Sequence, residues 1–129
     1  MTLTLLRPLR LTLSLTAVLL LAACNPAEML APDARLPDGS SYSGDIRDGL
    51  FHGDGVQQFA SGMIYRGQFH EGYWHGQGVL ESAMGWRYEG EFQKGMMEGQ
   101  GVLDNDGTRY EGAFVKGKFN GPGRYDVGD

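Results

Sequence analysis

One short segment of the chain carries side chains that commonly bind metal ions. Residues 70–75 read HEGYWH, which places His70, Glu71 and His75 close together in the sequence. A zinc-binding helix uses His-Glu-x-x-His, in which the two imidazoles share one face and converge on the ion. This segment has one residue too many, and we expect it to form a strand and a turn. The imidazoles would then not converge, so the sequence predicts no metal site.

Two other patterns resemble catalytic motifs only in part. Residues 112–119 read GAFVKGKF, but Phe119 stands where a phosphate-binding loop needs Ser or Thr to hold magnesium. Glu89, Glu91 and Glu111 are expected to gather on one polar surface, where paired carboxylates could hydrolyse a glycoside. Such a pair needs a cleft that raises the pKa of one carboxyl group. We expect a solvated surface instead, and therefore no enzyme.

Glycine and tyrosine repeat through most of the chain. Tyr42, Tyr65, Tyr88 and Tyr110 lie 23, 23 and 22 residues apart. Glycine follows each tyrosine at +2, +7, +11 and +13 and precedes it at −3, which accounts for 20 of the 21 glycines. A fixed period of this length indicates a repeat architecture. The one missing residue falls within 102–109, so a loop is expected to absorb it.

Each repeat reads as a β-hairpin. Aromatic or aliphatic residues and glycine alternate at +0, +2 and +4, so they share one face of a strand. The glycine at +7 predicts a turn, and a second strand follows from +11. Glycine weakens a strand unless its space is needed. We therefore expect an aromatic ring to lie over the bare backbone at +2 and +13.

The segment 88–103, YEGEFQKGMMEGQGVL, resembles a MORN repeat (membrane occupation and recognition nexus). The resemblance covers residues 39–125 and implies an all-β fold: an open, single-layer, twisted antiparallel sheet of about four hairpins. The repeat domain is expected over 39–129, and Pro122 suits its last edge strand. The residues that carry the repeat are Tyr42, Gly44, Tyr65, Gly67, Phe69, Tyr88, Gly90, Phe92, Tyr110, Gly112 and Phe114.

The N-terminal residues read as a processed leader. Residues 1–10 contain two arginines and no acid, and 11–23 form an apolar run too short to span a bilayer. The run ends in Leu-Ala-Ala-Cys at 21–24, which resembles the lipobox of bacterial lipoproteins. The resemblance implies cleavage after residue 23 and a covalent lipid on Cys24, the only cysteine. We expect no other cofactor.

A tether is expected between this anchor and the repeats. Residues 24–38 contain three prolines and no periodic apolar pattern. In the Gram-negative sorting pattern, aspartate after the lipidated cysteine retains a lipoprotein in the inner membrane; Asn25 therefore favours the outer membrane. Without Arg7 and Arg10, the 11 basic residues fall by two against 16 acidic ones, a net charge of −7. This charge excludes nucleic acid as a partner.

Three functions are compatible with this sequence. The first is a membrane-tethered scaffold in the cell envelope that binds an envelope protein or itself, because interface cores are rich in aromatic residues and methionine. The second, which the family name implies, is direct phospholipid binding, for which Lys94, Lys116 and Lys118 could form a local basic patch. The third and least favoured is a small envelope hydrolase. The candidate interaction surface consists of Phe51, Tyr73, Trp74, Met96, Met97 and Phe119.

Overall fold

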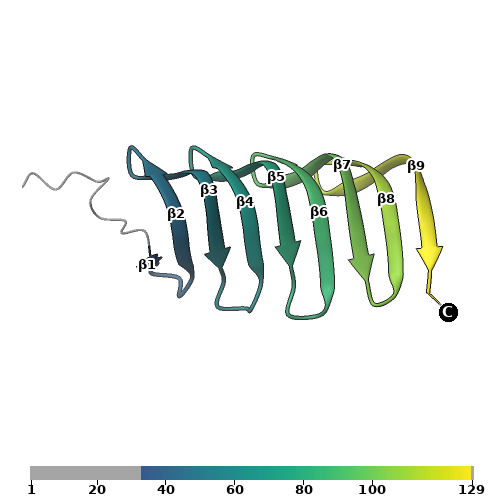
Figure 1. The fold of residues 1–129 in the computed structure, drawn as a ribbon, viewed down its shortest axis with the longest axis horizontal. Coiled ribbons are helices and arrows are strands. Elements are labelled where there is room, and N and C mark those ends of the chain that lie inside the picture. Colours follow the sequence, from purple (N-terminus) through teal and green to yellow (C-terminus); the bar gives the residue numbers. More distant parts are fainter. Residues whose placement is uncertain (1–32, 129) are drawn as a thin grey trace, which may run out of the picture.

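The computed structural model describes residues 33–128, and all the described strands belong to one antiparallel sheet. The strands lie side by side in chain order, and the two ends of the sheet do not meet (Figure 1). The described residues contain no helix. The predicted all-β, open, single-layer architecture is confirmed. The strands are β1 (Asp33–Arg35), β2 (Ser41–Arg47), β3 (Leu50–Gln58), β4 (Ile64–His70), β5 (Tyr73–Glu81), β6 (Trp86–Gln93), β7 (Met96–Asn105), β8 (Thr108–Val115) and β9 (Lys118–Val127).

The sheet begins earlier than the boundary at residue 38 that the sequence predicted. Asp33–Arg35 pairs with β2, with Ala34 opposite Tyr42. The chain can reverse here because Gly39 has φ 82° and the Ser40 N–H donates to the Asp38 carboxylate. The last residues of the expected tether therefore belong to the sheet. The leader, Cys24, Asn25 and the rest of the tether lie outside the described residues.

Four turns join the two strands of each repeat at one edge of the sheet; we call them the tip turns. Each has two central residues with positive φ, the second of which is the glycine at +7. In the second repeat these are Glu71 at 49° and Gly72 at 85°. Two positive φ angles in succession define a type I′ turn, whose twist matches that of the flanking strands. The tip turns are Asp48-Gly49, Glu71-Gly72, Lys94-Gly95 and Lys116-Gly117.

The return turns connect successive repeats at the opposite edge. Residues 60–62 form a three-residue loop closed by a hydrogen bond from Gly62 N–H to the Phe59 carbonyl (2.9 Å). Residues 83–85 do the same. The last return turn has only Asp106 and Gly107, both with positive φ, between the paired Asn105 and Thr108. This shorter turn accounts for the missing residue, as the sequence predicted.

Each hairpin is bent where its tyrosine meets its glycines. Strand β5 carries a bulge opposite Gly67 and Gln68, where Gly76 has φ 58°. A bulge bends its strand and leaves a backbone group unpaired. The Tyr65 hydroxyl donates to the Gln68 carbonyl at this point (2.8 Å). The same bond recurs in the other three repeats, and Figure 1 shows the hairpins arching over at the tip edge.

The core is a row of rings on one side of the sheet, which we call the aromatic face. The Tyr65 ring meets Phe69 of its own repeat and Phe92 of the next edge to face, with centroids 5.1 and 5.0 Å apart. Each phenylalanine thus joins two repeats, and edge-to-face geometry is favourable for aromatic pairs. The buried core side chains are Tyr42, Tyr65, Phe69, Leu80, Tyr88, Phe92, Tyr110 and Phe114.

Strand β9 lies at one edge of the described sheet and is exposed along its whole length. Pro122 lies within it, in agreement with its prediction as an edge-strand residue. Because no described repeat follows, no phenylalanine covers Phe119, which is 51% exposed. Among the described aromatic residues, the rings of Phe119 and Tyr125 contact Tyr110, Phe114 and each other.

Candidate functional site

The structure divides the six residues of the predicted interaction surface between two environments. Those at +9 point into the aromatic face. Phe51 stacks on Tyr42 with centroids 3.8 Å apart, and Trp74 stacks on Tyr65 at 4.7 Å. Met97 also packs against the core. Of the +9 residues, Phe119 alone is largely exposed, because it lies on β9.

The residues at +8 lie at the tips of the hairpins and face solvent. Tyr73 is 58% exposed and Met96 is 43% exposed. The sequence analysis did not include Leu50, the equivalent residue of the first repeat, which is 47% exposed. Leu50 and Tyr73 each lean over the tip glycine of the next repeat: a Cβ on Gly72 or Gly95 would lie 3.8 or 3.9 Å from them. We call Leu50, Tyr73 and Met96 the tip row.

A shallow hollow of about 250 Å³ lies beside the tip row, lined by residues of the first, second and third repeats. Trp74 forms part of its wall, and its indole N–H donates to the Gln57 side chain (3.0 Å). Phe59 packs edge to face on the same indole, with centroids 5.9 Å apart. Tyr73 reaches this hollow from the tip row. A shallow surface with two aromatic walls and one fixed amide is thus available beside the exposed ring of Tyr73.

The histidines lie closer together than the sequence predicted. The ring centroids of His70 and His75 are 5.4 Å apart, and those of His52 and His70 are 5.2 Å apart. The two rings of the HEGYWH segment are therefore neighbours, which the sequence analysis did not expect. His70 and His75 are on adjacent strands, where Gln68 pairs with His75 and His70 with Tyr73. Such diagonal neighbours lie on the same face of the sheet, within reach of long side chains.

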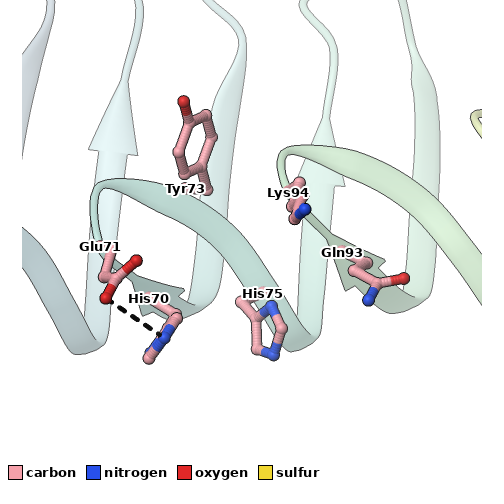
Figure 2. A pocket seen from close by; sticks show the side chains of 6 residues that line it. All are labelled: His70, Glu71, Tyr73, His75, Gln93 and Lys94. Atoms are coloured by element: carbon pink, nitrogen blue, oxygen red, sulfur yellow. Dashed lines mark ion pairs between the residues drawn. The ribbon is translucent and has the colours of Figure 1, made fainter.

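Figure 2 shows the hollow that these side chains line. It measures about 350 Å³ and is bordered by His70, Glu71, Tyr73, His75, Gln93 and Lys94. The His70 and His75 rings lie on the same side of the hairpin, and Tyr73 points the opposite way. The Glu71 carboxylate lies 3.9 Å from His70 Nε2. The search of the described residues finds no group of three or more histidine, cysteine or acidic side chains able to hold a metal ion.

Charged side chains occupy the face opposite the core. Arg66 pairs with Glu81 at 2.7 Å, and Arg87 pairs with Glu81 at 3.5 Å and with Glu89 at 2.8 Å. Glu111 lies beyond Val102, which separates it from Glu89 across the sheet. The three glutamates considered for glycoside hydrolysis therefore do not form a pair in an enclosed cleft. Residues 112–119 form part of β8, a tip turn and the start of β9.

The family model described as MORN repeat matches residues 42–64, 65–87, 88–109 and 110–126. The chain belongs to the MORN-repeat family. The matched segments begin at the four tyrosines; each of the first three covers a hairpin and the return turn after it, and the fourth covers the hairpin of β8 and β9. No curated protein matches the chain. In the described MORN repeats, no helix is long and apolar enough to cross a membrane.

Proposed function

We propose that this MORN-repeat protein is a lipid-anchored scaffold of the bacterial cell envelope that binds a protein partner through the tip row and the adjoining hollow. The observation that carries the proposal is the line of exposed apolar side chains at the tips, which the fold does not need for its core. Tyrosine, methionine and tryptophan are enriched at the centres of protein interfaces. The binding role is favoured over hydrolysis because the three glutamates considered for hydrolysis, Glu89, Glu91 and Glu111, do not form an enclosed carboxylate pair within residues 33–128.

The hollow adds specificity to this surface. Trp74 and Phe59 give it apolar walls, while Gln57 is held by the indole N–H. A partner side chain inserted here would contact rings that are already fixed by stacking, so little conformational entropy is lost on binding. Interface residues of this kind carry most of the binding energy. Two copies of the chain could use the same surface, which makes self-association one form of the proposal.

Site-specific photo-crosslinking in cells tests the scaffold role. A photoreactive phenylalanine replaces Tyr73 in one variant and Met84 in another. Met84 is the matched control, because it is apolar and 88% exposed but lies in a return turn. We expect a discrete crosslinked species from position 73 that is weak or absent from position 84. Equal labelling at both positions, or none at 73, would contradict the proposed surface.

The anchor is the second part of the proposal. Its support is the Leu-Ala-Ala-Cys ending of the apolar leader and the single cysteine at Cys24. Two or more acyl chains hold a protein stably on a membrane, at about 0.8 kcal/mol for each buried methylene. Metabolic labelling with an alkyne fatty acid should mark the wild type and not Cys24→Ser. If both are labelled equally, or the wild type is unlabelled, the anchor is elsewhere or absent.

The outer membrane, facing the periplasm, is the proposed location in a Gram-negative host. The support is Asn25, which takes the place of the aspartate that retains lipoproteins in the inner membrane. Membrane fractionation of the wild type and Asn25→Asp tests this. We expect the wild type in the outer-membrane fraction and the variant shifted to the inner membrane. An identical distribution of the two would contradict the sorting role of Asn25.

Direct phospholipid binding is the second candidate, and the placement of three lysines favours it. Lys94 and Lys116 occupy equivalent positions in successive tip turns, and Lys118 follows on β9. Equivalent residues of neighbouring hairpins lie about 10 Å apart, so the three ammonium groups face one region of solvent. Flotation of the Cys24→Ser protein with anionic vesicles tests this candidate. Flotation that is lost in a Lys94, Lys116 and Lys118 to glutamine variant would favour it over the scaffold.

A further inference from the structure

Three histidines form a row across adjacent strands on the polar side of the hairpins. His52 is on β3, His70 on β4 and His75 on β5. Their neighbours Phe51, Phe69 and Trp74 point into the aromatic face, so alternation along each strand directs the imidazoles the other way. His70 is the middle member, because its ring is 5.2 Å from His52 and 5.4 Å from His75.

These ring separations match what two imidazoles show when they bind one metal ion. A histidine nitrogen lies about 2.0–2.1 Å from a bound zinc ion, which places the ring centroid about 3.2 Å away. Two such rings have centroids about 5.2 Å apart at a tetrahedral angle, and about 4.5 or 6.4 Å apart at the cis or trans positions of the tetragonal geometry that Cu²⁺ prefers. The observed 5.4 Å between the rings of His70 and His75 is close to these separations, so both imidazoles can reach one ion once their side chains rotate to aim a nitrogen at it. The hairpin that joins them fixes the two Cα positions before any ion arrives.

We propose that His70 and His75 form a two-imidazole site for a late first-row divalent metal ion, with Cu²⁺ bound most tightly. Imidazole is a preferred ligand of such ions, and the affinity order places Cu²⁺ above Ni²⁺ and Zn²⁺. Both side chains border the 350 Å³ hollow, which leaves room for water or a partner's side chain at the remaining coordination positions.

The pair of His70 and His75 is preferred to the pair of His52 and His70 because a single hairpin joins its two members. The Glu71 carboxylate lies 3.9 Å from His70 Nε2 and supplies compensating negative charge on the same hairpin. Lys94 also borders the hollow and opposes cation binding in part. His52 is on a separate hairpin, so its distance from His70 depends on the packing of two repeats.

Copper titration of matched variants tests the site, in full-length protein that carries Cys24→Ser so that the thiol does not react with Cu²⁺. The repeat itself supplies the substitutions. Gln93 holds in the third repeat the position of His70, and Asn120 holds in the fourth the position of His75. The variants are His70→Gln and His75→Asn, with His52→Asn as the control that makes the same change at the equivalent position of another repeat.

We expect His70→Gln and His75→Asn each to weaken Cu²⁺ binding at least tenfold in calorimetric titrations, and His52→Asn to change it less than threefold. Electron paramagnetic resonance should detect two imidazole nitrogens on copper in the control and one in His75→Asn. Circular dichroism should be unchanged in all three. Equal Cu²⁺ affinity in the wild type and His70→Gln would overturn the proposal. Equal losses from His52→Asn and His75→Asn would overturn the assignment of the pair.

Discussion

At the scale of single residues, the fold depends on one contact repeated in every unit. The Tyr88 ring lies along the backbone over Gly90 and Gly101, and its hydroxyl reaches the Glu91 carbonyl at 3.0 Å. The ring can approach so closely only because neither glycine has a Cβ. The hydroxyl then satisfies a carbonyl at the bulge, so a fully buried phenol has a hydrogen-bond partner. Glycine and tyrosine are therefore needed together.

Adding one methyl group at this contact should be strongly destabilising. A Cβ on Gly90 would lie 2.5 Å from the Gly101 Cα and 2.6 Å from both the Gln100 carbonyl and the Tyr88 hydroxyl. We expect Gly90→Ala to reduce the free energy of unfolding by about 3 kcal/mol, as overpacked cores do. Urea unfolding followed by circular dichroism measures the loss.

Gly85→Ala is the matched control for this experiment. Gly85 has φ 95° but no atom within 4 Å of an added Cβ, so only backbone strain applies. Left-handed strain costs about 1–2 kcal/mol for a residue with a side chain. If the two variants were equally stable, close approach of the ring would not be the reason for the glycine at +2.

The buried tyrosines also predict how stability depends on pH. Burial, with a smaller effect of Glu91, raises the pKa of Tyr88 to about 12 from 10.0, and burial also raises the pKa values of Tyr42 and Tyr65. The folded protein keeps these protons where the unfolded chain loses them. Stability is therefore complete below about pH 10 and falls as the pH rises toward 12.

Thermal unfolding at intervals from pH 8 to 12 measures this dependence. We expect a constant melting temperature up to about pH 10 and a steep decrease above it. Absorbance at 295 nm should show phenolate from the buried tyrosines appearing together with unfolding. A melting temperature that stayed constant to pH 12 would contradict the burial of these hydroxyl groups.

The sequence predicts the position of a side chain where the spacing of the repeat fixes it. It does not predict that position where it depends on the bend at the bulge of each hairpin. The position of the Tyr65 ring over Gly67 and Gly78 follows from the spacing of the repeat alone. The different roles of Tyr73 and Trp74 do not follow from spacing. Both are aromatic and adjacent in the sequence, and only the structure shows that Trp74 stacks on Tyr65 while Tyr73 is exposed. The proximity of His70 and His75 depends on the register of one bulged hairpin, which no periodic pattern specifies.

At the scale of strands and turns, the two edges of the sheet follow different rules. Every tip turn has two residues with positive φ and ends in glycine. The tip glycine also docks on the preceding repeat: Gly72 N–H donates to the Phe51 carbonyl at 2.9 Å, and Gly95 N–H to the Trp74 carbonyl at 3.0 Å. In the three-residue return turns, the glycine N–H donates to a carbonyl of its own loop and not to the preceding repeat. The length of a return turn can therefore vary, as the two-residue turn 106–107 shows.

Exchanging return turns should therefore be tolerated. Replacing Asp106-Gly107 with Ala-Ser-Gly, the sequence of 60–62, converts the two-residue loop into the three-residue loop used earlier in the chain. We expect the free energy of unfolding to change by less than about 1 kcal/mol, since three-residue loops ending in glycine suit hairpins well. Chemical denaturation measures this change.

Inserting one alanine between Lys94 and Gly95 is the comparison. It separates the two positive-φ positions of a tip turn and displaces the glycine that donates to Trp74. We expect this variant to lose several times more stability than the loop exchange. The assignment of different roles to the two edges would be wrong if both insertions had the same effect.

At the scale of the whole molecule, the described ring contacts and strand pairings join each repeat to its immediate neighbours. Each phenylalanine at +4 touches the tyrosine of its own repeat and that of the preceding one, as Phe92 touches Tyr88 and Tyr65. The described sheet order follows the chain without a crossover. Stability should therefore approximate a sum of repeat and interface contributions. The sequence could predict this architecture because each unit places tyrosine, phenylalanine or isoleucine, and glycine at the same positions. Strand β9 is exposed because it lies at the edge of the described sheet.

Removing one whole repeat should shorten the array without destroying it. Deleting residues 65–87 joins Ile64 to Tyr88, which restores the spacing between a return turn and the next tyrosine. We expect a cooperative β-sheet protein whose denaturant dependence, the m-value, falls by roughly a quarter, because that value scales with the surface exposed on unfolding. The deletion also removes His70 and His75, so this protein should lose the proposed copper site. Deleting only residues 65–76 removes about half a repeat, which reverses the direction of every later strand relative to the first repeat and leaves Phe92 without Tyr65, its partner in the preceding repeat. That protein should be unfolded by circular dichroism, and a folded product would show that the repeats are not the units of cohesion.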